Sequence, residues 1–337
     1  MARRRSRRWW RRGWSAVAID IDRAGAAGRR IGDTNGNNAC VGRLPAGAYK
    51  RALLESFPRM TAVIAPFESP SAGAEIHPSA IVSPRAVLGR GVRIGPWCQV
   101  GPDVVLEDGV RLVSHVVVDG HTRIGEAAIL FPFCTVGLEP QDLKYRGEPT
   151  RCEIGARTQI REHVTIHRGT VTGRGLTRVG ADCMLMAVAH VAHDCQLGDH
   201  VIVANNAVMG GHVTIGDHAV IGGAAALHQF VRIGRAAMIG GVSGVEADVI
   251  PFGSVIGNRA RLAGLNVIGL KRRGFEKDQI RRLHLAFRSL FHEGGVFAAR
   301  LAETRARFGG DSLVAEILAF IDAPSHRGLI RAELLPE

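Results

Sequence analysis

The sequence of 337 residues contains no stretch that approaches eighteen consecutive apolar residues, so it predicts no membrane-spanning helix and no stable membrane insertion. Aromatic residues make up only 5%, whereas glycine occurs 42 times, which is typical of a chain with many tight turns. No C-x-x-C pair occurs, so neither a zinc cluster nor a disulfide framework is indicated. We expect reduced thiols in a cytoplasmic protein; the cysteines are Cys40, Cys98, Cys134, Cys152, Cys183 and Cys195.

Basic residues are concentrated at the N-terminus. Residues 1–59 contain fourteen Arg or Lys and four Asp or Glu, which accounts for +10 of the formal net charge of +12. An export signal would need an apolar run after the basic residues, but Asp20 and Asp22 interrupt it. We expect this extension to be disordered, or to be upstream sequence with Met60 as the true start. No nucleic-acid partner is predicted for the rest of the chain.

The dominant pattern is an aliphatic residue at every sixth position. Twenty-six positions follow this spacing, with one slip after residue 166, and Met209 alone is not Val, Ile or Leu. They are Ile76, Val82, Leu88, Ile94, Val100, Leu106, Leu112, Val118, Ile124, Leu130, Val136, Ile154, Ile160, Ile166, Val179, Leu185, Val191, Leu197, Val203, Met209, Ile215, Ile221, Leu227, Ile233, Ile239 and Val245.

A spacing of six fits neither a helix, with a period near 3.6, nor an isolated strand, with a period of 2. It predicts a parallel β-helix, in which each six-residue unit forms one side of a coil. Three sides give eighteen residues per coil, so residues n and n+18 lie above each other at about 4.8 Å. The interior is narrow, which explains why these positions take branched aliphatics.

The pattern divides the chain into three parts. After the extension of residues 1–59, we expect a parallel β-helix over 60–253, with polar loops leaving the coil at 137–153 and 167–178. Long loops on a rigid scaffold usually carry function. Residues 254–337 are expected to form a C-terminal helical domain, because apolar residues there recur at helical spacing: Ile280, Leu283, Phe287 and Leu290, then Phe297, Leu301 and Phe308, then Leu313, Ile317 and Ile321.

Six of the fourteen histidines fall within residues 190–228, and four of them form the candidate cluster: His190, His193, His212 and His228. By the eighteen-residue count, His193 lies below Gly211, which lies below Gln229, so the four imidazoles are expected on adjoining coils. With Asp194 they form an acid/base surface. Two kinds of site fit this pattern. One is a three-histidine zinc site like that of the γ-class carbonic anhydrases, and the other is a metal-free acyltransferase with one histidine as base.

Longer motifs favour the second. The sequence resembles the UDP-N-acetylglucosamine O-acyltransferases of lipid A synthesis over about residues 74–331. The motifs that carry the resemblance are Gln141-Asp142-Leu143-Lys144-Tyr145, Gly147-Glu148-Pro149-Thr150, Thr165-Ile166-His167-Arg168-Gly169-Thr170, Ala189-His190-Val191-Ala192-His193-Asp194-Cys195, Leu227-His228-Gln229-Phe230, Gly269-Leu270-Lys271-Arg272-Arg273-Gly274-Phe275 and Arg327-Gly328-Leu329-Ile330-Arg331. The resemblance implies a left-handed coil and a homotrimer with sites between subunits.

The resemblance also implies transfer of an (R)-3-hydroxyacyl group from acyl carrier protein to the glucosamine 3-hydroxyl of the sugar nucleotide, without a metal or other cofactor. His193 matches the general base of the family, and Asp194 matches the acidic residue that orients it. Neighbouring strand residues usually point in opposite directions, so spacing alone does not predict this contact. Gly211 matches the residue whose N–H binds the oxyanion.

Further positions match substrate contacts of the family. Gly241 matches a position whose side chain limits acyl length, so a glycine there implies room for a longer chain. These residues come from loops that we expect to lie too far apart to close a pocket in one chain. The predicted substrate contacts are Gln141, Asp142, Lys144, His190, His212, His228, Gln229, Asn266, Arg272 and Arg273.

The sequence also leaves several alternative functions open. Besides the zinc hydratase, the chain could be a non-catalytic scaffold, or the N-acyltransferase of the same pathway, for whose extra uridine-binding domain residues 1–75 are too short and too polar. Leu138-Glu139-Pro140 departs from the most familiar members, which leaves open whether the acceptor carries a 3-hydroxyl or a 3-amino group.

Overall fold

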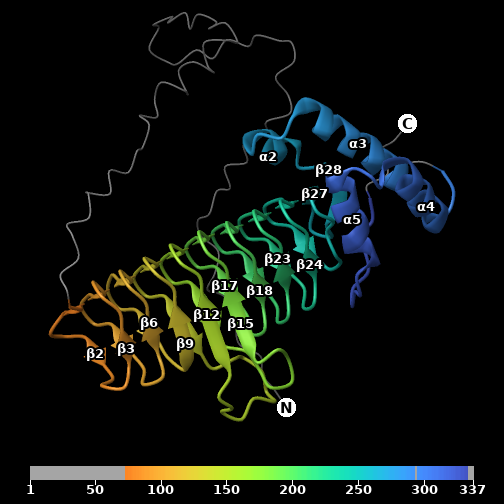
Figure 1. The fold of residues 1–337 in the computed structure, drawn as a ribbon. Coiled ribbons are helices and arrows are strands. Elements are labelled where there is room, and N and C mark those ends of the chain that lie inside the picture. The colour runs from red at the N-terminus through yellow and green to blue at the C-terminus, as the bar shows by residue number, and fades with distance from the viewer. Residues whose placement is uncertain (1–72, 293, 333–337) are drawn as a thin grey trace, which may run out of the picture. The chain divides into compact units, whose positions relative to one another are not determined.

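The computed structural model describes residues 73–292 and 294–332. The predicted N-terminal extension, residues 1–59, and the first residues of the predicted repeat domain, 60–72, lie outside these ranges. The described residues begin with short strands that wind into stacked coils (Figure 1).

The strands form three sheets, and up to residue 245 each strand pairs in parallel with the strand three further along the chain. The first sheet contains β1 (Glu75–Ile76), β4 (Arg93–Ile94), β7 (Arg111–Leu112), β10 (Ile129–Leu130), β13 (Gln159–Ile160), β16 (Met184–Leu185), β19 (Ile202–Val203), β22 (Val220–Ile221), β25 (Met238–Ile239), β27 (Gly253–Ile256) and β28 (Arg261–Leu265). The second contains β2 (Ile81–Val82), β5 (Gln99–Val100), β8 (Val117–Val118), β11 (Thr135–Leu138), β14 (Thr165–His167), β17 (His190–Val191), β20 (Val208–Met209), β23 (Ala226–Leu227) and β26 (Gly244–Val245). The third contains β3 (Val87–Leu88), β6 (Val105–Leu106), β9 (His121–Ile124), β12 (Arg151–Ile154), β15 (Leu176–Val179), β18 (Gln196–Leu197), β21 (Thr214–Ile215) and β24 (Arg232–Ile233).

The eighteen-residue register is observed wherever no loop intervenes. Ile76 lies opposite Ile94, and Leu185 opposite Val203. All the predicted inward positions from Ile94 to Val245 are buried. Ile76, in the first described coil, is 45% exposed because no described coil packs below it. The parallel β-helix predicted from the spacing of six is therefore confirmed.

Each coil turns at three corners, which we number by the sheets that they join: corner 1 joins the first and second sheets, corner 2 the second and third, and corner 3 the third and first. Many corners contain a non-glycine residue with positive φ, for example Asp194 with φ of +59°. A tight turn needs this left-handed conformation at one position, and it costs an ordinary residue about 1–2 kcal/mol. The stacking of the flanking strands must offset that cost.

Both long loops leave the coil at corner 2. Residues 139–150 connect β11 to β12, and residues 168–175 connect β14 to β15. The loops lengthen the spacing between paired residues beyond eighteen. Across the first loop Ile124 pairs with Ile154, and across the second loop Ile154 pairs with Val179. The stack of inward aliphatic side chains, which we call the inward ladder, therefore continues past both loops. The loops add residues to one corner only.

Helices follow the last coil: α2 (Val267–Arg272), α3 (Lys277–Phe291), α4 (Phe297–Phe308) and α5 (Ser312–Asp322). In α3, the predicted stripe of Ile280, Leu283, Phe287 and Leu290 is buried. The side chain of Asp311 caps α5 by accepting hydrogen bonds from the N–H groups of Leu313 and Val314. The predicted helical region is confirmed, while α2 and the antiparallel pair β27–β28 are not indicated by the spacing of six. None of the described helices is long and apolar enough to cross a membrane.

The coil and the helices are joined by polar contacts. Arg235, at corner 3, forms an ion pair of 2.6 Å with Glu316 of α5. The completely buried carboxylate of Asp248 accepts hydrogen bonds from the Arg232 Nε and the Ser325 hydroxyl. Figure 1 shows α3, α4 and α5 toward the end of the coil opposite β2 and β3.

The inward ladder predicts a clear stability difference between two identical substitutions. Ile160→Ala, in a fully buried position, should lower the free energy of unfolding by about 2–5 kcal/mol through lost apolar burial and a residual cavity. Chemical denaturation followed by circular dichroism measures this. Ile256→Ala, at a side chain that is 52% exposed, is the matched control and should cost much less. Equal losses in the two variants would contradict the ladder as the main source of stability.

Candidate active site

A cleft of about 640 Å³ lies along corner 2. One wall comes from the loop 139–150, and the other from the corners of three successive coils and the loop 168–175. The residues that line it are Gln141, Asp142, Leu143, Lys144, Thr172, Gly173, His193, His212, Gln229 and Phe230. Part of the predicted set therefore lines one open cleft within a single chain, because the loop 139–150 reaches the coils that follow it.

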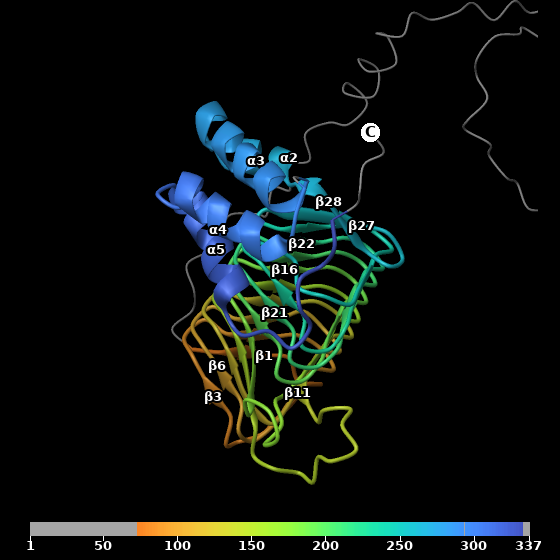
Figure 2. The same ribbon diagram turned by 90° about the vertical axis from the view of Figure 1, so that its right-hand side faces the viewer.

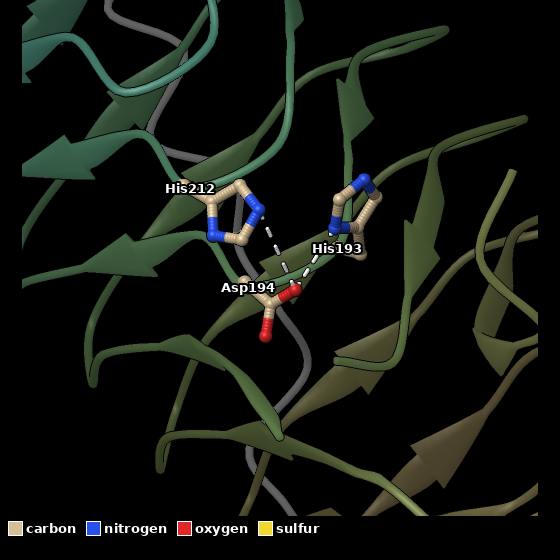
Figure 3. A group of neighbouring side chains, drawn as sticks. All are labelled: His193, Asp194 and His212. Carbon is tan, nitrogen blue, oxygen red and sulfur yellow. Dashed lines mark hydrogen bonds and ion pairs between the residues drawn. The ribbon is translucent and has the colours of Figure 1, made fainter. Parts of the chain in front are cut away.

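His193 and Asp194 form a hydrogen-bonded pair at this corner. The Nδ1 of His193 lies 2.9 Å from the Oδ2 of Asp194 (Figure 3). The two residues are at the turn between β17 and β18 rather than within a strand, and Asp194 has φ of +59°. The alternation of side chains that holds within a strand therefore does not apply, and both side chains turn to the same side.

Asp194 is completely buried and ionised. Burial alone would raise the pKa of Asp194, but hydrogen bonds from His193, Thr170 and the Arg174 N–H outweigh it and lower the pKa to about 2. A fixed negative charge therefore faces the Nδ1 of His193 and favours the tautomer with its proton on that nitrogen. The Nε2 of His193 is left as an acceptor and has no hydrogen-bond partner among the residues that the structure describes.

Gly211 lies one coil above His193, as the eighteen-residue count predicts. A Cβ on Gly211 would lie 2.5 Å from the Cε1 and 2.7 Å from the Nε2 of His193, so only glycine allows this contact. Gly211 is buried, and within residues 73–292 and 294–332 no acceptor faces its N–H. A free donor therefore lies beside the free acceptor of His193, which is the pair needed for attack on a carbonyl.

Further rings continue along the same corner. His212 contacts His193 edge to face at 5.1 Å and stacks on Phe230 at 4.4 Å, and Phe230 contacts His326 at 5.1 Å. Burial lowers the pKa of His212, although the charge of Asp194 acts against this. Phe230 occurs in one of the motifs that carry the resemblance, but neither Phe230 nor His326 is a predicted site residue, because neither lies at an inward repeat position or in the predicted histidine cluster.

The loop 139–150 brings predicted substrate contacts to the cleft. Asp142 turns the loop by accepting a hydrogen bond of 2.9 Å from the N–H of Lys144. Arg168 holds the loop against the coil, since its Nη1 donates to the Gly137 carbonyl and its Nε to the Tyr145 hydroxyl. Gln141, Asp142 and Lys144 lie around the cleft, within reach of a ligand beside His193.

Two predicted contacts, His190 and His228, lie near the cleft but do not line it. His190 is on β17, and its Nδ1 lies 2.7 Å from the Thr165 hydroxyl. The Nδ1 of His228 accepts a hydrogen bond of 2.5 Å from Arg327, which also donates to the carbonyl of Gln229. The C-terminal segment thereby holds the turn that presents Gln229, a role that the sequence did not indicate for Arg327.

The other predicted residues lie at different corners of the chain. Asn266 donates to the carbonyl of Ala236, and Arg273 donates to the carbonyl of His218, both at corner 3. The Asn266 side chain also caps α2, while Arg272 is exposed at the end of that helix. Both views show α2 on the opposite side of the coil from the loop 139–150 (Figures 1 and 2).

Gly241 is at corner 1, between β25 and β26. It is exposed, and a Cβ there would contact only Gly223, at 3.3 Å from its carbonyl oxygen. One chain therefore does not bring Gly241, Asn266, Arg272 or Arg273 to the cleft at corner 2.

The same site also contains side chains that could bind a zinc ion. His193, Asp194 and His212 offer three possible ligand atoms within 4.8 Å of one another. However, both carboxylate oxygens of Asp194 already accept hydrogen bonds: Oδ1 from the Arg174 N–H, and Oδ2 from His193 and the Thr170 hydroxyl. A cation would have to displace these donors from a completely buried carboxylate, so this donor set does not favour the metal interpretation.

Two family models match parts of the chain. Residues 248–330 match the second domain of UDP N-acetylglucosamine O-acyltransferases, and residues 85–120 and 176–211 match the bacterial transferase hexapeptide, a unit of six repeats. The first match covers the C-terminal region with its helices, and the second covers coils on both sides of the long loops.

Whole-chain comparisons agree with these matches. Two proteins named acyl-[acyl-carrier-protein]–UDP-N-acetylglucosamine O-acyltransferase are similar in sequence. The protein from Azorhizobium caulinodans is 53% identical over 218 residues (65% of this chain and 80% of its own), and that from Caulobacter vibrioides is 50% identical over 258 residues (77% and 98%). The crystal structure of LpxA from Acinetobacter baumannii is 41% identical and has a TM-score of 0.73, covering 76% of this chain and 99% of its own. These similarities confirm the left-handed β-helix with a C-terminal helical domain, and this chain belongs to the family of acyl-[acyl-carrier-protein]–UDP-N-acetylglucosamine O-acyltransferases.

Proposed function

We propose that the cleft at corner 2 transfers an (R)-3-hydroxyacyl group from acyl carrier protein to the glucosamine 3-hydroxyl of UDP-N-acetylglucosamine, the first step of lipid A synthesis, with His193 as the general base. Membership of the family supports the reaction. The observation that carries the residue assignment is that the Nε2 of His193 and the nearby N–H of Gly211 have no hydrogen-bond partner among the described residues. Asp194 is hydrogen-bonded to the other nitrogen of His193.

The chemistry follows from these positions. The Nε2 of His193 takes the proton of the sugar hydroxyl while the hydroxyl oxygen attacks the thioester carbonyl. The Gly211 N–H donates a hydrogen bond to the oxyanion of the tetrahedral intermediate, and the charge of Asp194 stabilises the imidazolium. The intermediate then collapses, the carbon–sulfur bond breaks, and the imidazolium returns its proton to the departing thiolate of the carrier protein.

The loop 139–150 suits the sugar nucleotide. The ammonium group of Lys144 can pair with a phosphate. The Asp142 carboxylate can accept hydrogen bonds from sugar hydroxyl and amide groups, and the Gln141 amide can accept or donate them. His212 and Gln229 line the far side of the same cleft. Substrates bound there would lie between this loop and His193.

His193→Ala should lower kcat by about a hundredfold or more, because the sugar hydroxyl loses the base that accepts its proton. The measurement uses purified protein, acyl-carrier-protein thioesters, and UDP-sugars that carry either a 3-hydroxyl or a 3-amino group. His121→Ala, an exposed histidine on β9, is the matched control and should retain activity. A fully active His193→Ala protein would refute the assignment and favour a non-catalytic role for the site.

We also propose that the active protein is a homotrimer with sites between subunits. The predicted substrate contacts divide into one group at corner 2 and another at corners 1 and 3, and one chain does not bring the two groups together. In a closed ring of identical subunits, corner 2 of one copy can meet another corner of the next. Asn266, Arg272 and Arg273 would then complete the site from the neighbouring subunit.

This division can be tested by mixing two defective variants. His193→Ala and Arg272→Ala subunits should each form inactive or weakly active trimers. Co-expression in equal amounts should restore activity in about a quarter of the sites, because an active site then needs an intact His193 and an intact Arg272 from adjacent subunits. Activity equal to the sum of the two parents would contradict sites that are shared between subunits.

We propose that the acyl chain passes Gly241, where the open space at corner 1 leaves room for a long chain. The protein should therefore prefer a fourteen-carbon acyl donor to a ten-carbon donor in the same transfer assay. Gly241→Met, which fills part of this space, should move the preference toward the shorter donor. A wild-type preference for the ten-carbon donor would contradict this role.

A cytoplasmic location is part of the proposal. The five cysteines in the described ranges, Cys98, Cys134, Cys152, Cys183 and Cys195, are buried free thiols, which suits a reducing compartment. Acyl carrier protein and the UDP-sugar are the proposed partners of the cleft, in agreement with the names of the relatives.

A further inference from the structure

The loop 168–175 encloses the carboxylate of Asp194. Its backbone supplies N–H donors from Thr170, at 3.2 Å from both carboxylate oxygens, and from Arg174, at 2.8 Å from Oδ1. The Arg174 guanidinium also donates to the carbonyl of Asp194 at 3.1 Å. On the other side, the Asp194 N–H donates to the Thr177 hydroxyl at 2.8 Å. The loop therefore surrounds this one residue with donors.

The side chain of Thr170 has a specific place in this arrangement. Its hydroxyl donates a hydrogen bond of 2.7 Å to Asp194 Oδ2, the same oxygen that binds His193 Nδ1 at 2.9 Å. Thr170 is 2% exposed, so water cannot replace this donor easily. The Thr172 hydroxyl lies 3.3 Å from the Thr170 hydroxyl, which leaves the Thr170 proton free to point at the carboxylate.

The backbone of the loop is pressed against the same groups. A Cβ on Gly173 would lie 2.5 Å from the Cγ of Asp194 and 2.6 Å from the Cε1 of His212. This close approach fixes the height of the loop over the carboxylate, so the Thr170 hydroxyl reaches Oδ2 from a defined direction. A loop that served only to connect β14 and β15 would not need this contact.

We propose that Thr170 is a positioning residue for acyl transfer, whose hydroxyl holds the orientation and charge of Asp194 and through it the direction of the His193 ring. The inference rests on the proposed role of His193. Thr170 does not line the cleft, and it acts only through Asp194.

The Thr170 hydroxyl has two effects on the hydrogen-bonded pair of His193 and Asp194, which we call the dyad. It hydrogen-bonds to Oδ2 of Asp194, so it stabilises part of the negative charge that also faces His193. It also prevents the carboxylate from rotating away from the His193 ring. Without the Thr170 hydroxyl, Oδ2 of Asp194 keeps more negative charge and stabilises the protonated imidazole of His193 more strongly. A protonated His193 cannot act as a base, so the inactive form of the protein should persist to higher pH. Other titratable or charged groups around the dyad are His167, His190, His212, Arg174, Cys195 and Asp142.

The test compares Thr170→Val, which keeps the shape of the side chain, with Thr170→Ser, which keeps the hydroxyl. In the Val variant, kcat should fall about tenfold with little change in the KM for the UDP-sugar, as expected for loss of one hydrogen bond to a charged group. The acid limb of its kcat/KM profile should move to higher pH by about half a unit. The Ser variant should restore both values to those of the wild type.

The matched control is Thr158→Val. Thr158 is also fully buried, but its hydroxyl donates to the Gly180 carbonyl at corner 3, a different corner from that of His193 and Asp194. This control should lower thermal stability and leave kcat and the pH profile unchanged. If Thr170→Val does not fold, Thr170→Ala removes the same hydroxyl with less crowding, and the same measurements apply to it.

The outcomes separate the two proposals. A wild-type protein without acyl transfer, or a fully active His193→Ala variant, would refute the proposed function. If the wild type is active and His193→Ala is not, but removal of the Thr170 hydroxyl changes neither kcat nor the acid limb, Thr170 is only a structural residue and this inference is wrong.

Discussion

The narrow interior of the coil is the constraint on which the rest of the structure depends. Each side of a coil can place one branched aliphatic side chain inside, and parallel pairing with the next coil aligns these side chains into ladders. A change of one residue in this register would put an outward side chain into the interior. The register therefore stays fixed along the coil, and any added residues must leave it at a corner.

Corner 2 is where the chain departs from the repeat, and the dyad is there for a physical reason. The left-handed conformation of Asp194 turns its side chain toward that of His193, which residues of one strand cannot do. The two insertions then cover this corner: the loop 168–175 supplies donors to Asp194, and the loop 139–150 supplies the opposite wall of the cleft. The inward ladder thus stabilises the fold, whereas corner 2 positions the residues of the candidate site.

The sequence predicts the ladder well because each inward position depends only on its own size and shape. The stacking of Gly211 on His193 also follows from the eighteen-residue count. The contact of His193 with Asp194 does not, because it depends on a backbone conformation that the residue types do not specify. The roles of Thr170, Phe230 and Arg327 depend on how two loops and the C-terminal segment fold back on the coil, which no spacing along the chain reveals.

The negative charge of Asp194 depends on the hydrogen-bond donors around its buried carboxylate. Asp194 stays ionised although it is completely buried, because His193 and the loop 168–175 provide donors to both of its oxygens. A buried carboxylate with fewer donors would take up a proton and could no longer stabilise an imidazolium. In the proposed mechanism, the loop is therefore required for His193 to act as a base, although no residue of the loop needs to touch the reacting atoms. An insertion in a structural repeat is, in this mechanism, part of the catalytic apparatus.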